Sequence, residues 1–319
     1  MFEVSGYAMG DSGLRLNIFV NEPDIYECVD FQAYDCLRVV QFARAGVVEH
    51  GNYDAVLVGL KEIIDDAFLS RFGGVQYIAS NTTGVDHIRA AGSVQIIHLE
   101  PGEIERVSAT AEFTLGLLLS VARKIPFVDP ERVGDRLVYR GVQLRGRRLG
   151  IFGMGRLGRK MARYAEALDM SWQGYDREDG DEEKREILKS CDVITLHLPL
   201  SPETIGFIGW KEFDLMGRRP FLLNTSRPQL VEKRALVDAL ERSRIAGAAM
   251  DFINYDGSDV CDPCLRKYMG EKLLMTPHIA GNTYESVQYT ARVVVDKLIR
   301  KFRKDSQRRL CANGGMSAT

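Results

Sequence analysis

The 319-residue sequence lacks a long hydrophobic run, a strong bias of charge and a dense set of cysteines. No stretch approaches the ~18–20 uninterrupted apolar residues of a membrane-spanning helix. Lys and Arg number 42, Asp and Glu 44, and the net charge is −2, which excludes a generally basic nucleic-acid-binding protein and a polyacidic disordered chain. We therefore expect an ordinary globular protein with neither a membrane nor a nucleic acid as partner.

The features of secreted proteins are also missing. Residues 1–30 show neither the basic nor the apolar segment of a secretory signal, and six cysteines are too few for a disulfide scaffold. Cys261 and Cys264 form a CxxC pair, but no second pair or histidine pair stands at zinc spacing. We expect a cytoplasmic protein without a metal site and interpret the CxxC pair as reduced thiols. A redox-active pair or half of a metal site is the alternative.

The length suggests two domains, since domains usually hold about 100–200 residues. Short apolar runs alternate with segments of helix length, which is typical of parallel β–α–β units. A second series of such runs begins near residue 149 and continues to residue 281. The sequence therefore predicts an α/β fold with parallel sheets. The strands predicted for the first domain are 15–20, 36–40, 54–60, 74–80 and 94–99.

Three segments have helical patterns. Residues 110–126 are apolar on nearly every side, which predicts a deeply buried helix that joins the two domains. Residues 156–168 follow a glycine-rich turn, and residues 283–303 carry apolar side chains at helical spacing. The basic residues from Lys297 to Arg309 are interpreted as a solvated final helix and frayed tail, with an anion-binding surface as the alternative.

A glycine pattern predicts a dinucleotide site. Gly153, Gly155 and Gly158 form GxGxxG between an apolar run and a helical segment. The first glycine permits a tight turn, the second admits a pyrophosphate and the third lets the helix pack on the strand. Asp176 follows eighteen residues after Gly158, where an acid accepts from ribose hydroxyls and repels a 2′-phosphate. NAD is favoured over NADP, although the adjacent Arg177 weakens that preference.

Seven ordered motifs resemble those of the D-isomer-specific 2-hydroxyacid dehydrogenases, which include phosphoglycerate, glycerate and D-lactate dehydrogenases. The motifs are TTGVDHI (82–88), TAEFTLGLLL (110–119), LRGRRLGIFGMGRLGR (144–159), CDVITLHLPLSPET (191–204), FLLNTSR (221–227), AGAAMD (246–251) and TPHIAG (276–281).

The resemblance implies a doubly wound, Rossmann-type NAD domain inserted into a flavodoxin-like substrate domain. The implied boundaries are 104–282 for the NAD-binding domain, and 1–103 with 283–319 for the substrate-binding domain.

The resemblance also implies the catalytic residues. Arg227 matches the family's arginine, whose planar guanidinium suits a carboxylate and a neighbouring carbonyl oxygen. His278 matches the acid/base that moves a proton at oxygen. Asp256 stands where the family has a glutamate; a carboxylate there would raise the pKa of His278, with one methylene less of reach. Asn254 is the alternative partner in another register, and His197 is interpreted as structural.

Other roles follow from the same resemblance. Thr83 and Gly84 are expected to bind the substrate carboxylate through backbone amides, together with Arg227. Pro228 replaces the glycine that usually follows the arginine, which fixes φ and removes one N–H. The implied cofactor-binding residues are Thr110, Gly153, Gly155, Arg156, Leu157, Gly158, Asp176, Leu198, Pro199, Thr204, Thr225, Ser226, Asp251 and His278.

The predicted function is hydride transfer between NAD and C2 of a small D-2-hydroxy acid or its 2-oxo acid. The substrate is expected between the two domains, and the protein is expected to be a homodimer. The alternative is an NAD-sensing scaffold or corepressor-like protein with little turnover. Asp256 and Pro228 favour it slightly, because a protein without turnover tolerates changes around catalytic residues.

Overall fold

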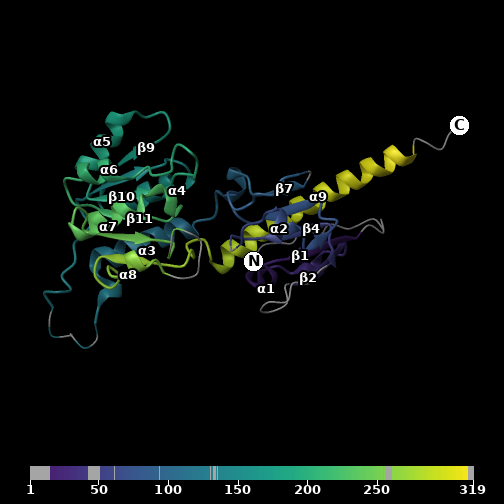
Figure 1. The fold of residues 1–319 in the computed structure, drawn as a ribbon, viewed down its shortest axis with the longest axis horizontal. Helices are drawn as coiled ribbons and strands as arrows, with labels where there is room; N and C mark the ends of the chain where they lie inside the picture. Colours follow the sequence, from purple (N-terminus) through teal and green to yellow (C-terminus); the bar gives the residue numbers. More distant parts are fainter. Residues whose placement is uncertain are drawn as a thin grey trace. The chain divides into compact units, whose positions relative to one another are not determined.

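A computed structural model of the chain describes residues 15–41, 51–60, 62–92, 94–129, 131, 134, 136–253, 255 and 261–314. The chain forms two compact units, which are described separately (Figure 1). Unit 1 consists of Met1–Ile104 with Val287–Thr319, and unit 2 of Glu105–Ser286. Each contains a parallel sheet with helices, which confirms the predicted α/β fold class. In the described part of the chain, no helix is long and apolar enough to cross a membrane.

Unit 1 contains a five-stranded sheet in the order β2-β1-β4-β6-β7 and a separate pair, β3 with β5. Counted along the main sheet, this order is the 2-1-3-4-5 of flavodoxin-like folds. The five strands of the main sheet coincide with the predicted segments, with ends shifted by at most three residues, whereas β3 and β5 were not predicted. The elements are β1 (Leu16–Val20), α1 (Pro23–Cys28), β2 (Leu37–Gln41), β3 (Gly51–Asn52), β4 (Ala55–Val58), α2 (Asp66–Leu69), β5 (Phe72–Gly73), β6 (Tyr77–Ser80) and β7 (Gln95–Ile97).

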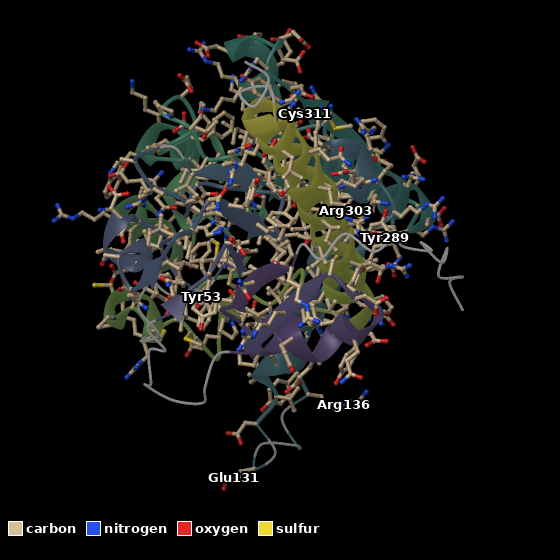
Figure 2. The ribbon with its side chains drawn as sticks, turned by 90° about the vertical axis from the view of Figure 1, so that its right-hand side faces the viewer. Tyr53, Glu131, Arg136, Tyr289, Arg303 and Cys311 are labelled. Atoms are coloured by element: carbon tan, nitrogen blue, oxygen red, sulfur yellow. The ribbon has the colours of Figure 1, made fainter. Side chains whose placement is uncertain are left out.

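The last helix, α9 (Tyr284–Gly314), continues beyond the predicted end at residue 303. Its apolar side chains pack in unit 1, and Leu298 is fully buried. The polar second half is also attached, because the Tyr77 hydroxyl donates to Asp305 at 2.9 Å. Apolar spacing alone could not detect this part of the helix. Figure 2 labels three residues along α9, namely Tyr289, Arg303 and Cys311.

Unit 2 contains a six-stranded parallel sheet in the order β13-β12-β11-β10-β8-β9. Its elements are α3 (Ala109–Arg123), β8 (Arg148–Phe152), α4 (Arg156–Ala167), β9 (Ser171–Tyr175), α5 (Asp181–Ser190), β10 (Val193–Leu196), α6 (Trp210–Leu215), β11 (Phe221–Asn224), α7 (Lys233–Glu241), β12 (Gly247–Met250), α8 (Pro263–Arg266) and β13 (Leu273–Met275).

The core of unit 2 has two layers, one on each face of the sheet. Successive side chains of a strand point to opposite faces. Ile151 of β8 therefore packs in a cluster with residues of α3 and α4, whereas its neighbour Phe152 packs in a cluster with residues of α5, α6 and α7. Both faces are covered by helices, which explains why the strands read as continuous apolar runs.

α3 differs from the predicted helix in two respects. It ends at Arg123 because Lys124 adopts a left-handed conformation with φ 57°, and a 3-10 turn at Ile125–Phe127 follows. Its burial is one-sided: Leu118 is 1% exposed, whereas Leu119 is 37% exposed. This helix therefore carries more apolar side chains than the core of unit 2 buries.

Candidate active site

The carboxyl ends of the six parallel strands of unit 2 lie at one level of the sheet. Strand pairing aligns Tyr175, Phe152, Leu196, Asn224, Met250 and Met275 across the sheet. The next residue of each strand therefore lies along one edge, and these residues are Asp176, Gly153, His197, Thr225, Asp251 and Thr276. β8 stands between β9 and β10, where the strand order reverses, and open α/β sheets bind ligands at the carboxyl edge of such a position.

The glycine turn follows β8 at this edge. Gly153 has φ 98°, and a Cβ built on it would lie 2.6 Å from the carbonyl oxygen of His197. A Cβ on Gly158 would collide with the carbonyl oxygen of Gly153. A Cβ on Gly155 would instead meet no heavy atom within 4 Å. Two of the glycines are therefore required by the turn itself, and the third keeps its surroundings open.

The start of α4 can hold a phosphate. Gly155 is its N-cap and offers no side chain to the amides of the first turn, so these N–H groups have no capping partner within the helix. A 12-residue helix adds a positive partial charge at this end. Arg156 donates a hydrogen bond to the Val107 carbonyl, and Leu157 packs against the core. The arrangement fits a dinucleotide pyrophosphate.

Two loops flank the glycine turn. Asp176 follows β9, and its Oδ1 accepts from the Arg177 amide at 2.9 Å. After β10, the Thr204 hydroxyl donates to the Pro199 carbonyl at 2.6 Å and accepts from the Ser201 amide at 2.8 Å. Leu198 lies in the same loop and packs against the core. The predicted adenosine-side residues thus belong to ordered turns at the ends of neighbouring strands.

His197 follows β10 directly. Its amide donates to the Phe152 carbonyl at 2.7 Å, and its Nε2 lies 3.0 Å from the Thr195 hydroxyl oxygen. Burial, with the Arg156 charge second, lowers the pKa of His197 to about 4, so the ring is neutral at physiological pH. Its buried Nδ1 has no hydrogen-bond partner among the described residues. A buried polar atom without a partner beside the glycine turn is consistent with an external ligand.

A hydroxyl chain connects α3 to the end of β11. Thr114 donates to the Thr110 carbonyl at 2.7 Å, so the Thr225 hydroxyl, 2.8 Å away, donates to Thr114. Thr225 is 7% exposed. The predicted nicotinamide-side residues Thr110 and Thr225 are thereby brought together through Thr114.

Arg227 lies in the turn after β11. Its backbone is extended, with φ −131° and ψ 141°, and Pro228 begins a short 3-10 turn. The buried amide of Asn224 spans this turn: Nδ2 donates to the Arg227 carbonyl at 2.8 Å and Oδ1 accepts from the Ser226 amide at 3.0 Å. The Ser226 hydroxyl donates to the Leu196 carbonyl at 3.0 Å.

His278 lies in the turn after β13 and is exposed. Its φ is 56°, and its amide donates to the Thr276 carbonyl at 2.9 Å. Asp251, which follows β12 and is 2% exposed, accepts three hydrogen bonds from this turn. The donors are the Thr276 hydroxyl at 2.7 Å, the Ile279 amide at 2.9 Å and the Ala280 amide at 2.7 Å.

The remaining predicted residues are placed differently. Asp256 and its alternative Asn254 lie outside the described residues. Thr83 and Gly84 belong to unit 1, in the turn after β6, where the Thr82 hydroxyl donates to the Gly84 carbonyl at 2.7 Å. Cys261 and Cys264 are both free thiols, and the described residues contain no group of three potential metal ligands.

Sequence reasoning missed Asn224 and Thr276. Asn224 stands inside the motif FLLNTSR and Thr276 inside the motif TPHIAG, but neither carries a reactive group. The feature of the sequence that could have indicated these two residues is a polar residue at the end of an apolar run. Only hydrogen-bond geometry shows what each residue holds.

The parallel sheet, the glycine turn and the open helix start define unit 2 as a Rossmann-type dinucleotide-binding domain. Residues 115–280 match the model of the D-isomer specific 2-hydroxyacid dehydrogenase, NAD binding domain. The chain belongs to this family; it is an NAD-dependent dehydrogenase with NAD as its cofactor.

Relatives and solved structures agree with this assignment. A glycerate dehydrogenase from Methylorubrum extorquens is 33% identical, with 72% of this chain and 77% of that protein covered. A D-3-phosphoglycerate dehydrogenase from Archaeoglobus fulgidus is 28% identical, and this chain spans only 57% of its length. The TT0316 protein from Thermus thermophilus has a TM-score of 0.73 at 28% identity, covering 89% of this chain and 96% of that one.

Proposed function

We propose that the protein transfers a hydride between NAD and C2 of a small D-2-hydroxy acid or the corresponding 2-oxo acid. The observation that carries the proposal is the succession of Arg227, Asp251 and His278 after the neighbouring strands β11, β12 and β13, at the edge that bears the glycine turn. Strand ends at this edge face the ligand in open α/β sheets.

In the direction of reduction, Arg227 binds the substrate carboxylate and polarises the C2 carbonyl. When bound, reduced NAD would supply the hydride that C2 accepts. His278, protonated, donates its proton to the C2 oxygen, so that an alcohol forms and the histidine becomes neutral. Asp256 is its proposed carboxylate partner. Thr83 and Gly84 of unit 1 are proposed to bind the substrate carboxylate through backbone amides.

The cofactor contacts follow the same edge. Amides from Gly155 to Gly158, with Arg156 and Leu157, are proposed to line the pyrophosphate, and Asp176 the adenosine ribose. Leu198, Pro199 and Thr204 would border the adenosine. The nicotinamide end is proposed to lie against a separate group, which consists of Thr110, Thr225, Ser226, Asp251 and His278.

The test is turnover of NADH with a panel of glyoxylate, hydroxypyruvate, pyruvate and 2-oxoglutarate. We expect oxidation of NADH with at least one of them, and its loss in Arg227→Ala and in His278→Ala, each of which should still bind NADH. Binding of NADH without turnover of any panel member would contradict the proposal and favour an NAD-sensing scaffold.

We also propose a homodimer. Large apolar side chains are exposed on α3 and in the segment that follows it in unit 2: Leu119 at 37%, Ile125 at 62% and Leu137 at 69%. Exposed apolar residues that gather on a surface mark interaction sites. Light scattering should give twice the chain mass, and Leu137→Glu should reduce it; a monomeric wild type contradicts this proposal.

A cytoplasmic location is proposed on chemical grounds. All six cysteines are free thiols, as is usual in reducing compartments. Fluorescent tagging and fractionation of cells would test it, and recovery outside the cytoplasm would contradict it.

A further inference from the structure

We propose that the buried side chains of Asn224 and Asp251 are positioning residues of this enzyme. Asn224 fixes the backbone conformation of the turn that contains Arg227, and Asp251 fixes that of the turn that contains His278. This inference rests on the proposed function for the roles of Arg227 and His278, and on the hydrogen bonds of the two turns.

The turn of His278 depends on outside support. A positive φ is unfavourable for a residue with a Cβ, and such a conformation persists where the surroundings over-determine it. Asp251 supplies this support, because its donors, Thr276, Ile279 and Ala280, stand on both sides of His278 in the chain. One carboxylate therefore fixes the entry and the exit of the turn.

The carboxylate is suited to this task. It offers about four acceptor positions and no donor, and three of them are taken by the turn. An amide at position 251 would keep one oxygen and turn an NH₂ group toward N–H donors. Because Asp251 is 2% exposed, water cannot easily replace the lost acceptor.

Asn224 performs the corresponding task for Arg227. It is fully buried, and it uses both its donor and its acceptor across the turn, on the Arg227 carbonyl and the Ser226 amide. Pro228 adds a second restraint, because the residue before a proline is confined to extended backbone. The backbone of Arg227 is thus restrained both by the hydrogen bond from Asn224 and by the following proline.

The two supports are joined. The Asp251 amide donates to the Asn224 carbonyl at 3.0 Å, since β11 and β12 are neighbours in the sheet. The turns of Arg227 and His278 therefore extend from a common rigid base. A substrate clamp and a proton donor must keep a fixed separation during reaction, and a misplacement of 1 Å can cost on the order of 100-fold in rate.

The first experiment is Asp251→Asn, measured as kcat at saturating NADH, KM for the best 2-oxo acid, and Kd for NADH by fluorescence titration. Positioning predicts a fall in kcat of about 100-fold, larger than any weakening of NADH binding that follows from loss of the proposed nicotinamide contact of Asp251. Asp192→Asn is the matched control. Asp192 is also buried, at 7% exposed, but it lies at the opposite edge of the same sheet, paired with Arg147 and Arg218.

The second experiment is Asn224→Asp, which keeps the acceptor for the Ser226 amide and removes the donor to the Arg227 carbonyl. Because Arg227 is the proposed carboxylate clamp, this variant should raise KM for the 2-oxo acid by about tenfold or more and lower kcat less than Asp251→Asn does. A general loss of folded structure would instead change kcat and KM to the same extent in Asp251→Asn, Asn224→Asp and Asp192→Asn, and that result would overturn the proposal.

Hydrogen exchange separates this inference from the proposed function. The Ile279 and Ala280 amides should exchange at least tenfold faster in Asp251→Asn than in wild type. In Asp192→Asn their exchange rates should equal those of wild type. Equal rates in all three proteins would overturn the positioning role. So would a Kd for NADH weakened tenfold with kcat unchanged, which would make Asp251 a cofactor ligand only. Absence of turnover in wild type would refute the proposed function, while the exchange rates would still decide the role of Asp251.

Discussion

Gly153 offers a sharp test of the glycine turn. In Gly153→Ala, the new Cβ must accept φ 98° and a separation of 2.6 Å from the His197 carbonyl oxygen. The strained backbone costs about 1–3 kcal/mol, and the enforced shift of the end of β10 costs about 1–3 kcal/mol more. We therefore expect the free energy of unfolding of unit 2 to fall by about 2–6 kcal/mol.

The assay is urea denaturation followed by tryptophan fluorescence. Both tryptophans of the chain, Trp172 and Trp210, lie in unit 2, so the signal reports this unit. NADH binding is measured on the same samples at low urea. Gly153→Ala should lose both stability and affinity for NADH.

Two matched variants separate strain from crowding. Gly146 has φ 74° with no heavy atom near its Cβ position, so Gly146→Ala should cost only about 1–2 kcal/mol and leave NADH binding intact. Gly155→Ala should cost less than about 1 kcal/mol but weaken NADH binding, because its methyl group occupies the open approach to α4. A Gly153→Ala protein as stable as wild type would refute the reasoning.

Three further outcomes are expected. The depressed pKa of His197, about 4 against an ordinary 6.5, means that the unfolded chain binds a proton which the folded chain does not. The stability of unit 2 should therefore fall between pH 6.5 and 4, by up to about 3 kcal/mol, and His197→Gln should flatten this dependence in urea titrations at each pH. Asp176→Ala should improve binding of NADPH relative to NADH about tenfold or more, because it removes the repulsion of the 2′-phosphate; an unchanged ratio would exclude a ribose contact. Tyr77→Phe removes the hydrogen bond to Asp305 from a residue that is 1% exposed, which should cost about 1–2 kcal/mol and speed trypsin cleavage at residues 300–309; unchanged cleavage would mean that this contact does not hold α9.

Periodicity and motif spacing were sufficient to predict the strands of the parallel sheets and the glycine turn. Alternating elements and GxGxxG are local features, and the residues that create them stand next to one another in the chain. The end of α9 was not accessible in this way, because its polar half is held by Tyr77, a residue more than 200 positions away. The exposed side of α3 was missed for the opposite reason: its apolar residues exceed what unit 2 covers, and composition does not tell which neighbour covers them.

The sequence by itself determined the family and the cofactor, and it supplied Arg227 and His278 as the proposed reactive side chains, because these predictions depend on residue type and motif order along the chain. Only the tertiary structure decided how the reactive turns are held. Asp251 acts across strands, through hydrogen bonds from the Ile279 and Ala280 amides of the turn after β13, whereas Asn224 holds the turn that follows its own strand, through the Arg227 carbonyl and the Ser226 amide. Backbone partners leave no trace in the pattern of side chains, and those of Asp251 exist only once β12 and β13 lie side by side.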